Sequence, residues 1–198
     1  MILGIDIDDT ITNTYDSLST YAQEYTISEL HRQPDYENVD CSTHRYTKSM
    51  MHWSDEEEHN FFIKYYEKVI GEVKTKFLAS KYLKKLQEDG HKIVLITARF
   101  RLDEVFSVEE LTKNYIKENN IPCDKLIIDA QNKGKVAKEE NIDIFIDDSY
   151  INCKEVSKEG IKVYMMDSRV NCSLPKDDDI ERVYSWPQVY SKLKEINQ

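Results

Sequence analysis

Residues 1–10 read Met1-Ile-Leu-Gly-Ile5-Asp6-Ile-Asp8-Asp9-Thr10, an apolar run followed at once by acids. Such a short apolar run is typical of a buried strand in a parallel sheet. Ligands of open α/β sheets bind beyond the carboxyl ends of the strands. The three acids of this stretch stand at the carboxyl end of the expected strand. Grouped carboxylates repel one another unless a cation or a proton offsets their charge. The stretch therefore indicates a Mg²⁺ site with a carboxylate free to do chemistry.

The composition indicates a globular chain with an acidic balance. It has 198 residues, of which 40% are hydrophobic and 32% charged, and its net charge is −10. This length suits one well-cored domain, or one domain that carries an inserted module. Proteins that bind duplex nucleic acid ordinarily carry a basic face, so a nucleic-acid polymer is not the expected partner. An acidic enzyme can still bind a small phosphate ester where a metal or local Lys and Arg side chains neutralise the site.

The cysteines and the apolar runs favour a cytoplasmic protein. The four cysteines form no C-x-x-C pair and are expected to be reduced thiols. The apolar run 2–7 is too short for a secretory signal, and no basic region precedes it. No apolar run approaches ~18 residues, so we expect no membrane span. Nothing in the sequence decides the oligomeric state.

Apolar segments alternate with helical patterns over much of the chain. Ser107-Val-Glu-Glu110 is a capping box that opens a helix to about Glu118, and Ser185 resembles the N-cap of a last helix. This alternation predicts an α/β three-layer sandwich with a parallel, Rossmann-like sheet. The expected strands are 2–7, 92–97, 125–129, 142–147 and 162–166, and further helices are expected over 133–140 and 149–159.

Residues 16–77 break the alternation. They contain no convincing strand, but helical patterns cover 15–30 and a stretch from the capping box at Ser54 to about Val69. We interpret 16–77 as a small helical cap inserted after the first strand, and 1–15 with 78–198 as the α/β core.

The insertion is rich in aromatic residues. Aromatic rings can stack on a nucleobase, but a small helical module also needs large side chains for its own core. We therefore expect at most two or three of them to contact a substrate. The residues concerned are Tyr15, Tyr21, Tyr25, Tyr36, Tyr46, Trp53, Phe61, Tyr65 and Tyr66.

The acids of the first strand end suit phosphoryl transfer. A carboxylate at Asp6 can attack phosphorus and form an aspartyl-phosphate. A second acid two residues on, Asp8, can protonate the leaving oxygen and then deprotonate the hydrolytic water. Residues two apart in an extended strand share a face, so both can converge on one substrate.

Three later positions supply the complementary groups. Thr97 ends the second expected strand, and its hydroxyl can hold a phosphoryl oxygen. Lys133 opens a helix, and its ammonium can offset phosphoryl charge. Lys135 lies near the same helix start and remains a rival for this role. Asp147-Asp148 ends the fourth expected strand as a second acidic cluster suited to the same metal.

The order of these residues resembles the four motifs of the haloacid dehalogenase superfamily. The matching segments are Asp6-Ile-Asp-Asp-Thr10, Ile93-Val-Leu-Ile-Thr97, Lys133 and Asp147-Asp148. Within the superfamily, the chain is most similar to the type C 5′-nucleotidase branch, the cytosolic deoxyribonucleotidases and their bacterial relatives. That likeness rests on the segment 133–148, on Ile96-Thr-Ala-Arg99 and on Val183-Tyr-Ser-Trp-Pro187.

The resemblance implies a role for each matching position. Asp6 would be the nucleophile and a Mg²⁺ ligand, and Asp8 the general acid/base that gives the metal its backbone carbonyl. Thr97 and Lys133 would hold the phosphoryl group. Ala98 and Arg99 are placed at the same phosphate site, although a solvated surface position is an equal alternative for Arg99. The resemblance also makes Asp147 and Asp148 metal ligands, and it implies the strand order 5-4-1-2-3 for the five expected strands.

The expected function is a Mg²⁺-dependent phosphatase that works through an aspartyl-phosphate on nucleoside or deoxynucleoside 5′-monophosphates. Superfamily members that cleave carbon–halogen or carbon–phosphorus bonds typically lack an acid where Asp8 stands, so a phosphate ester is expected. A phosphatase for sugar phosphates or other small esters is the enzymatic alternative. A non-catalytic nucleotide-binding or phospho-signalling module is the alternative of another class. The order of the motifs argues against a signalling receiver, in which the lysine comes last.

Overall fold

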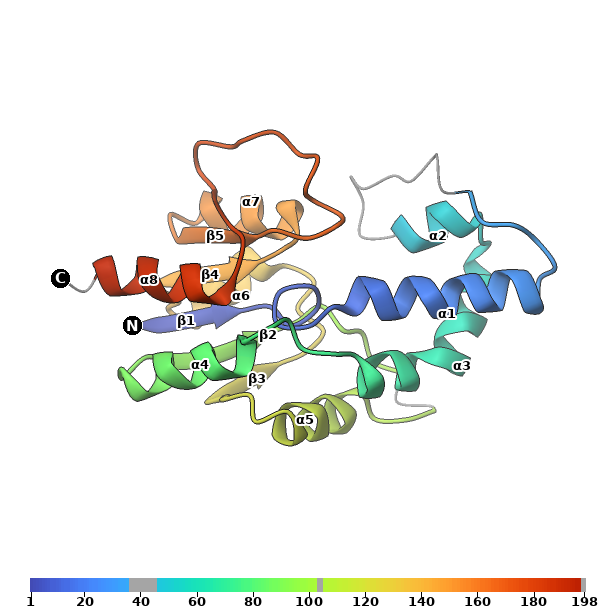
Figure 1. The fold of residues 1–198 in the computed structure, drawn as a ribbon, viewed down its shortest axis with the longest axis horizontal. Coiled ribbons are helices and arrows are strands. Elements are labelled where there is room, and N and C mark those ends of the chain that lie inside the picture. The colour runs from blue at the N-terminus through green and yellow to red at the C-terminus, as the bar shows by residue number, and fades with distance from the viewer. Residues whose placement is uncertain (36–45, 103–104, 197–198) are drawn as a thin grey trace.

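The structure is a computed structural model that describes residues 1–35, 46–102 and 105–196. At its centre lies a parallel sheet of six strands in the order β3-β2-β1-β4-β5-β6 (Figure 1). The strands are β1 (Ile2–Ile5), β2 (Lys92–Ile96), β3 (Lys125–Ile127), β4 (Ile144–Asp147), β5 (Lys162–Met166) and β6 (Glu181–Val183). The five expected strands are present, and their order is the one that the resemblance implies.

The sixth strand, β6, is absent from the sequence-based prediction. It contains three residues, and only Val183 among them is fully buried. β6 pairs with β5 at one end of the sheet, and the three-residue strand β3 forms the other end. A short edge strand that exposes charged residues lacks the apolar run by which a buried strand is predicted.

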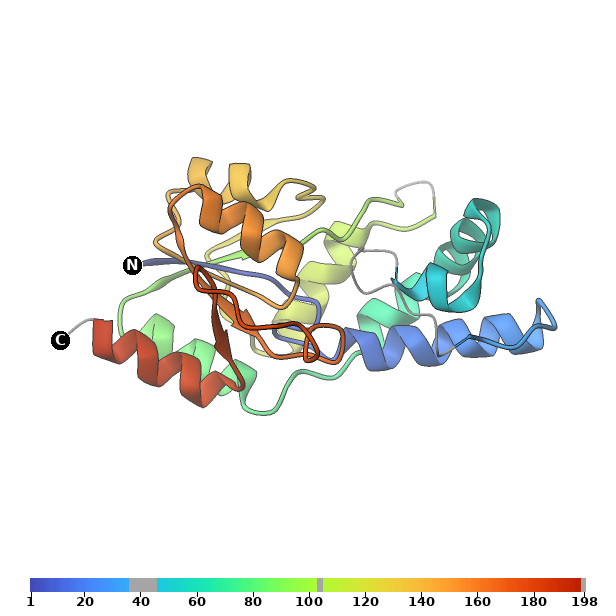
Figure 2. The same cartoon turned by 90° about the horizontal axis from the view of Figure 1, so that it is seen from above.

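Helices cover both faces of the sheet and complete a three-layer α/β sandwich. On one face, α4 (Ala79–Glu88), α5 (Val108–Glu118) and α8 (Trp186–Ile196) pack on the outward side chains of β1, β2 and β4. On the other face lie α6 (Lys133–Glu139) and α7 (Tyr150–Lys158). Figure 2 shows α6 and α7 above the sheet and α4 and α8 below it. This confirms the predicted fold class.

Close packing inside the sheet explains the glycine in β1. A Cβ atom on Gly4 would lie 2.7 Å from the ring of Phe145 and 2.9 Å from a methyl of Ile142. Such distances are too short for real contacts, because interiors are packed at crystal-like density. Gly4 therefore lets the central strand β1 lie against the apolar cluster under α6 and α7.

The helical segment lies beyond the carboxyl end of the sheet (Figure 1). It consists of α1 (Thr14–Ser28), α2 (Tyr46–Met51) and α3 (Asp55–Glu72). The predicted capping box at α3 is present, because Ser54 Oγ accepts from Glu57 N at 3.2 Å and Ser54 N donates to Glu57 Oε2 at 2.8 Å. Aromatic side chains fill the interior of this segment: Tyr25, Trp53, Phe61 and Tyr65 are all buried.

Two chain crossings connect the helical segment to the sheet, and they pair with each other. Thr12 and Thr75 form an antiparallel bridge between the crossings. On either side of it, Asn13 N donates to Lys74 O at 2.9 Å and Lys76 N donates to Ile11 O at 2.7 Å. The helical segment is thus joined to the sheet by a short two-stranded ribbon.

Two further expectations concern the cysteines and membrane-spanning helices. Cys123, Cys153 and Cys172 are free, and Cys41 lies outside the described residues. No helix in the described part of the chain combines the length and the apolar character that a bilayer crossing requires.

Candidate active site

Three acids meet where β1 and β4 end. Asp6 directly follows β1, and its backbone N donates to Ile146 O of β4 at 2.9 Å. Asp147 is the last residue of β4, and Asp148 follows it. Because Ile5 lies opposite Ile146 in the parallel register, these side chains share one edge of the sheet. Asp6, Asp147 and Asp148 are all buried, and each offers a carboxylate oxygen within 4.8 Å of the others.

A buried lysine faces two of these acids. Lys133, the first residue of α6, places its Nζ 2.5 Å from Asp6 Oδ1 and 2.7 Å from Asp147 Oδ2. Its side chain is only 1% exposed. The side chain of Lys135 is 73% exposed and lies on the solvent side of the same helix, near Glu139. The structure therefore brings Lys133, and not Lys135, to the acidic cluster.

The charges of this cluster are unbalanced. Burial raises the pKa of Asp6 to about 8, although Lys133 opposes the shift. Burial and the neighbouring carboxylates also raise the pKa of Asp148 well above its usual value. The ammonium of Lys133 contacts two of the three buried carboxyl groups, and the oxygens of all three are hard ligands at close range. This donor set fits Mg²⁺, which prefers oxygen ligands and usually takes only a few from the protein.

Backbone and amide groups fix Asp147. Ser149 N donates to Asp147 Oδ1 at 2.8 Å, and Asn152 Nδ2 donates to Asp147 Oδ2 at 3.1 Å. Ser149 is also the N-cap of α7, where its side chain accepts from the N–H of Asn152. The start of α7 therefore orients the carboxylate that ends β4.

A polar network from the loop after β5 fixes Asp148. Ser168 Oγ donates to Asp148 Oδ2 at 2.9 Å, and Asn171 Nδ2 donates to Asp148 O at 2.7 Å. The Oδ1 atom of Asn171 accepts from Ser168 N at 3.1 Å and from Arg182 Nη1 at 2.6 Å. Ser168, Asn171 and Arg182 belong to none of the motifs recognised in the sequence. The available signal is their position, because a loop that follows a parallel strand lies at the ligand-binding edge of the sheet.

The Asp8 carboxylate is held apart from the cluster by its own set of donors. Arg99 approaches it with two nitrogens, Nε to Oδ2 and Nη2 to Oδ1, each at 2.9 Å. Thr14 Oγ1 donates to Oδ1 at 2.6 Å, and Thr97 Oγ1 lies 3.3 Å from Oδ2. Burial alone would raise the pKa of Asp8, but the charge and hydrogen bonds of Arg99, together with Thr14 and the charge of Lys133, outweigh it, and the pKa is lowered.

The neighbouring acid, Asp9, caps helix α1. Both of its carboxylate oxygens accept from Tyr15 N, at 3.0 Å each, in the first turn of α1. The N-cap residue of this helix, Asn13, makes no side-chain cap of its own. Asp9 therefore satisfies a helix N–H group that would otherwise lack a partner, and its left-handed backbone, with φ of 56°, turns the chain toward α1.

The residues that follow β2 differ in exposure. Thr97 is fully buried, and its hydroxyl accepts from Arg99 N at 3.2 Å. Ala98 is exposed and lines the cavity described below. Arg99 is 3% exposed, so the alternative of a solvated surface position is wrong for this residue.

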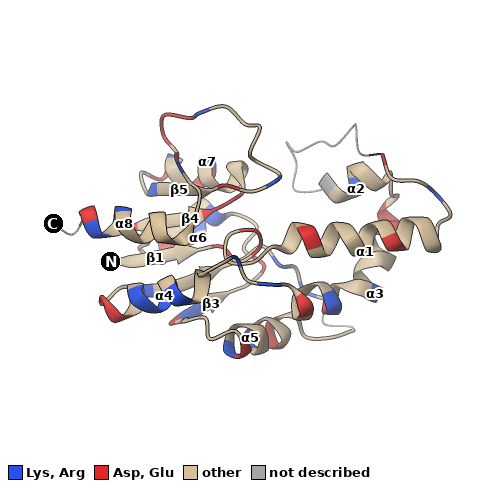
Figure 3. Cartoon of the chain, in the orientation of Figure 1, with Lys and Arg blue, Asp and Glu red and all other residues tan. Residues whose placement is uncertain are grey.

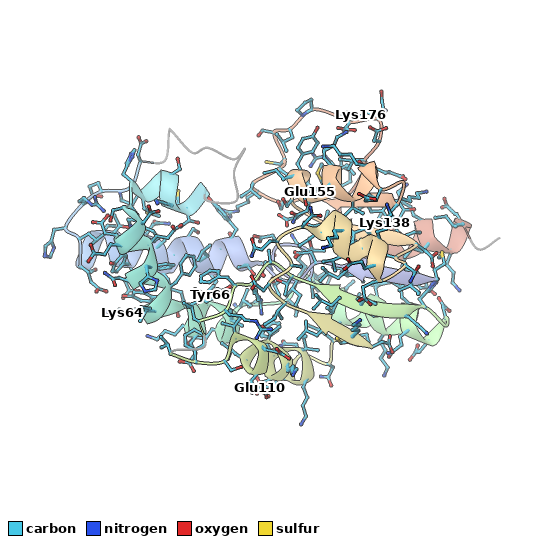
Figure 4. The ribbon with its side chains drawn as sticks, turned by 180° about the vertical axis from the view of Figure 1, so that it is seen from behind. Lys64, Tyr66, Glu110, Lys138, Glu155 and Lys176 are labelled. Carbon is cyan, nitrogen blue, oxygen red and sulfur yellow. The ribbon has the colours of Figure 1, made fainter. Side chains whose placement is uncertain are left out.

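A cavity of about 920 Å³ separates the acidic edge from the helical segment. Figure 3 shows acidic positions, in red, in the loop between β1 and α1 at this edge. Figure 4 shows Tyr66 on the side of α3 that faces the sheet. The lining residues on the sheet side include Asp6, Asp8, Thr97, Ala98, Arg99, Lys133 and Asp148, and those on the helical side include Leu18, Glu58, His59, Phe62 and Tyr66.

Aromatic rings form one wall of the cavity. The rings of Tyr66 and Phe100 stack, with centroids 4.9 Å apart and an interplanar angle of 13°. Phe62 meets Phe100 edge-on, also at 4.9 Å. Among the described aromatic side chains that the sequence singles out in the insertion, Tyr66 alone lines the cavity. Tyr36 and the side chain of Tyr46 lie outside the described part of the structure. Phe100 is not among the residues that the sequence predicts for the site. Its position directly after Arg99, in the segment that follows β2, could have indicated it.

A comparison with protein families decides the affiliation. The model of the family "5′ nucleotidase, deoxy (Pyrimidine), cytosolic type C protein" matches residues 1–196. The chain belongs to this 5′-nucleotidase family. A nucleotidase of Clostridium acetobutylicum is similar to it, with 31% identity over 187 residues that cover 94% of this chain and 90% of the relative. The expected membership of the haloacid dehalogenase superfamily, and of its phosphatases, is confirmed.

Solved structures agree with the fold of this nucleotidase-family member. A haloacid dehalogenase-like hydrolase of Streptococcus pneumoniae superposes with a TM-score of 0.70 at 15% identity, covering 97% of each chain. A predicted phosphatase of Clostridium acetobutylicum superposes with a TM-score of 0.67 at 13% identity, covering 98% of each. At such identities the likeness concerns the fold alone. For a phosphatase of the type C family, the buried acidic edge beside the cavity is the candidate active site.

Proposed function

We propose that the chain is a Mg²⁺-dependent 5′-nucleotidase that hydrolyses nucleoside or deoxynucleoside 5′-monophosphates through an aspartyl-phosphate. One observation carries the proposal: Asp6, Asp147 and Asp148 form a buried acidic group, with Lys133 against it, that opens onto a cavity with an aromatic wall. The family match over 1–196 supports the nucleotide class. The family's cytosolic description supports a cytoplasmic location.

The metal would be held by residues already described. The carboxylates of Asp6, Asp147 and Asp148 would be its protein ligands, together with the backbone carbonyl of Asp8. A bound Mg²⁺ supplies charge that polarises the phosphoryl group. Lys133 adds a fixed positive charge from the protein itself, at a buried position where electrostatic interactions are little screened by solvent.

The remaining groups would bind and orient the phosphate ester. The hydroxyl of Thr97 and the backbone of Ala98, which follow β2 and line the same cavity as Lys133, would contact phosphoryl oxygens. Fixing the phosphorus in line with a carboxylate oxygen of Asp6 makes the attack effectively unimolecular. The protein thereby lowers the barrier by positioning as well as by charge.

The reaction would proceed in two steps on the side chains of this chain. Because its pKa is lowered, Asp8 would begin as a carboxylate and take the acidic proton of the monoanionic phosphate ester. Asp6 attacks phosphorus, the bond from phosphorus to the 5′-oxygen breaks, and Asp8 gives that oxygen the proton. Asp8, now a carboxylate, takes a proton from water as the water attacks the phosphorus of the acyl phosphate. Inorganic phosphate leaves with the proton that Asp8 holds, and both side chains return to their starting states.

The helical segment would select the leaving group. We propose that residues 16–77 act as a cap, which excludes water and contacts the nucleoside while 1–15 and 78–198 carry the chemistry. The wall formed by Phe62, Tyr66 and Phe100 offers ring faces and edges on which a base can stack. This wall favours a nucleotide over a sugar phosphate, which has no aromatic ring.

Phosphate release from a panel of nucleotides and sugar phosphates tests the proposal. Wild type should turn over 5′-nucleotides best, in Mg²⁺ and not in EDTA, and Asp6→Asn should lower kcat on the order of 10⁴-fold or more. Asp178→Asn is the matched control, because the side chain of Asp178 is 98% exposed. A preference for sugar phosphates would keep the mechanism and refute the nucleotidase. Mg²⁺-dependent nucleotide binding without any turnover would favour the non-catalytic alternative.

A further inference from the structure

Arg99 is a buried cation whose guanidinium is committed to protein acceptors. Its Nε and Nη2 atoms contact the two oxygens of Asp8 at 2.9 Å each, and its Nη1 donates to Thr112 Oγ1 at 3.2 Å. The side chain of Arg99 is 2% exposed, whereas that of Asp8 is 29% exposed. A two-point contact of this kind fixes the plane of a carboxylate as well as its place.

The backbone of Arg99 is anchored in the α/β core. Its N–H donates to Thr97 Oγ1 at 3.2 Å, and its carbonyl accepts from Asp129 N at 3.1 Å. Thr112, which receives the third contact of the guanidinium, lies on α5. Every one of these attachments belongs to the sheet-bearing part of the chain. Arg99 therefore supports Asp8 from the α/β core.

We propose, on the basis of the proposed function, that Arg99 is a positioning residue that holds the Asp8 carboxyl group in the orientation from which it serves the leaving oxygen. This assignment replaces the sequence-based expectation that Arg99 binds the phosphate. Arg99 lines the cavity, but the paired donors Nε and Nη2, with which an arginine grips a phosphate from two points, both contact Asp8, and Nη1 donates to Thr112. Arg99 acts through Asp8 and has no direct contact with the ester.

The two roles differ in how they depend on the leaving group. A nucleoside 5′-oxygen is a poor leaving group and needs a proton as its bond to phosphorus breaks. The oxygen of p-nitrophenol leaves as a stabilised phenolate and has little need of a proton. Loss of a residue that orients the acid therefore slows the first ester more than the second. Loss of a phosphate-binding residue slows both alike, because both carry the same phosphoryl group.

The test compares kcat/KM for a 5′-nucleotide and for p-nitrophenyl phosphate in wild type, Arg99→Met, Arg99→Lys and Arg101→Met. For the nucleotide, Arg99→Met should lose on the order of 100-fold, mostly in kcat, and for p-nitrophenyl phosphate less than about 10-fold. Arg99→Lys should recover part of the loss, because one ammonium can still contact Asp8. Arg101→Met is the control, because the side chain of Arg101 is 49% exposed.

A double-variant cycle isolates the action through Asp8. If Arg99 works only through that side chain, Arg99→Met should cost almost nothing more in an Asp8→Asn background. Should Arg99→Met fail to fold, Thr112→Val removes one support without leaving a buried charge, and the same split between the two esters is expected on a smaller scale.

Two results would overturn the inference. Equal losses for both esters with a raised KM would make Arg99 a phosphate ligand, and an unchanged kcat/KM for both would make it a packing residue. Wild-type turnover separates these results from a failure of the proposed function. If wild type hydrolyses no nucleotide, the proposed function fails; if it does and the losses do not split, only the role of Arg99 fails.

Discussion

The acidic edge of the sheet and the helical segment both bury large side chains, but they do so by different physics. At the edge, Asp6, Lys133 and Asp147 are buried as ionisable groups, and each has a specific partner within 2.7 Å. In the helical segment, the buried side chains are aromatic, and rings such as Trp53 and Phe61 pack on one another at 4.7 Å. Removal of one member therefore has different consequences: a lone charge at the edge, but a void among the rings.

The difference also separates what each region contributes. The edge places reactive groups at fixed points, because strand register decides where each side chain emerges. The helical segment shapes a wall, and the stripe of α3 that faces the cavity differs from the stripe that fills the interior. Substitutions on the two regions should therefore separate chemistry and charge balance from packing and substrate choice.

The largest effect on stability is expected from Lys133→Met. Without the ammonium, Asp6 and Asp147 remain as buried carboxylates that lack a counter-charge, and the free energy of unfolding should fall by about 3–5 kcal/mol. The measurement is urea unfolding in EDTA. Lys135→Met on the same helix should change it by less than about 0.5 kcal/mol, because that side chain is mostly exposed. Equal losses of unfolding free energy in the two variants would show that the buried ion pairs of Lys133 contribute no more to stability than an exposed lysine does.

Phe61→Ala tests the packing side of the comparison. Phe61 is fully buried among Tyr25, Trp53 and Tyr65, and its loss should cost about 3 kcal/mol. Unfolding followed through Trp53 fluorescence in a Trp186→Phe background reports on the helical segment, since the chain has no other tryptophan. Substrate preference should stay unchanged, because Phe61 does not line the cavity.

Phe62→Ala, one residue along α3, is the counterpart on the cavity side. If its ring supports a stacked base worth roughly 1–2 kcal/mol, KM for nucleotides should rise about 5- to 30-fold, with little change for p-nitrophenyl phosphate. An equal rise in KM for both esters would show that the aromatic wall does not contribute to recognition of the base.

The edge of the sheet could be predicted from the sequence because its residues are defined by position along the chain. Asp6, Thr97 and Asp147 each end an apolar run or directly follow one, and parallel strands bring such ends together. The start of α3 was equally predictable, since Ser54 and Glu57 cap it locally.

The rest depends on contacts between distant segments. The guanidinium of Arg99 could meet phosphate, solvent or another side chain, and its partner Asp8 lies 91 residues away. Ser168 and Asn171 are ordinary polar loop residues until the loop folds back on Asp148. The rotation of α3, which sends Phe61 inward and Phe62 to the cavity, is decided by packing against α1 and the core. No local pattern in the sequence carries this information.

Asn171→Ala asks whether the edge also depends on its outer supports. The side chain of Asn171 contacts Asp148 O, Met166 O and Arg182, so its removal should loosen the Asp148 carboxylate. Mg²⁺ affinity, measured by calorimetry or by the rise of Tm with Mg²⁺, should fall about 10- to 100-fold. The exposed neighbour Cys172 offers the control Cys172→Ala. An unchanged Mg²⁺ affinity in Asn171→Ala would show that metal binding depends on the ligands alone and not on the residues that hold them.

The smallest effect is expected at the capping box of α3. Ser54→Ala removes the acceptor for Glu57 N and should lower the free energy of unfolding by about 1 kcal/mol. Ser54→Asp keeps an acceptor and should stay close to wild type in the same urea titration. A loss as large as that of Phe61→Ala would show that the helical segment depends on its first turn as much as on its rings.

The shortness of β3 and β6 has a consequence for the behaviour of the protein in concentrated solution. An edge strand presents unpaired N–H and C=O groups, and a long apolar edge invites another chain to add itself and start an aggregate. Both edges of this sheet end after three residues and begin with an exposed charge, Lys125 on one side and Glu181 on the other. Arg182, which follows Glu181, places a second charge on the β6 edge. The sheet therefore has little room at either margin for a foreign strand, and the apolar strands that carry the acids stay in its interior, away from fibril-forming contacts (Figure 1).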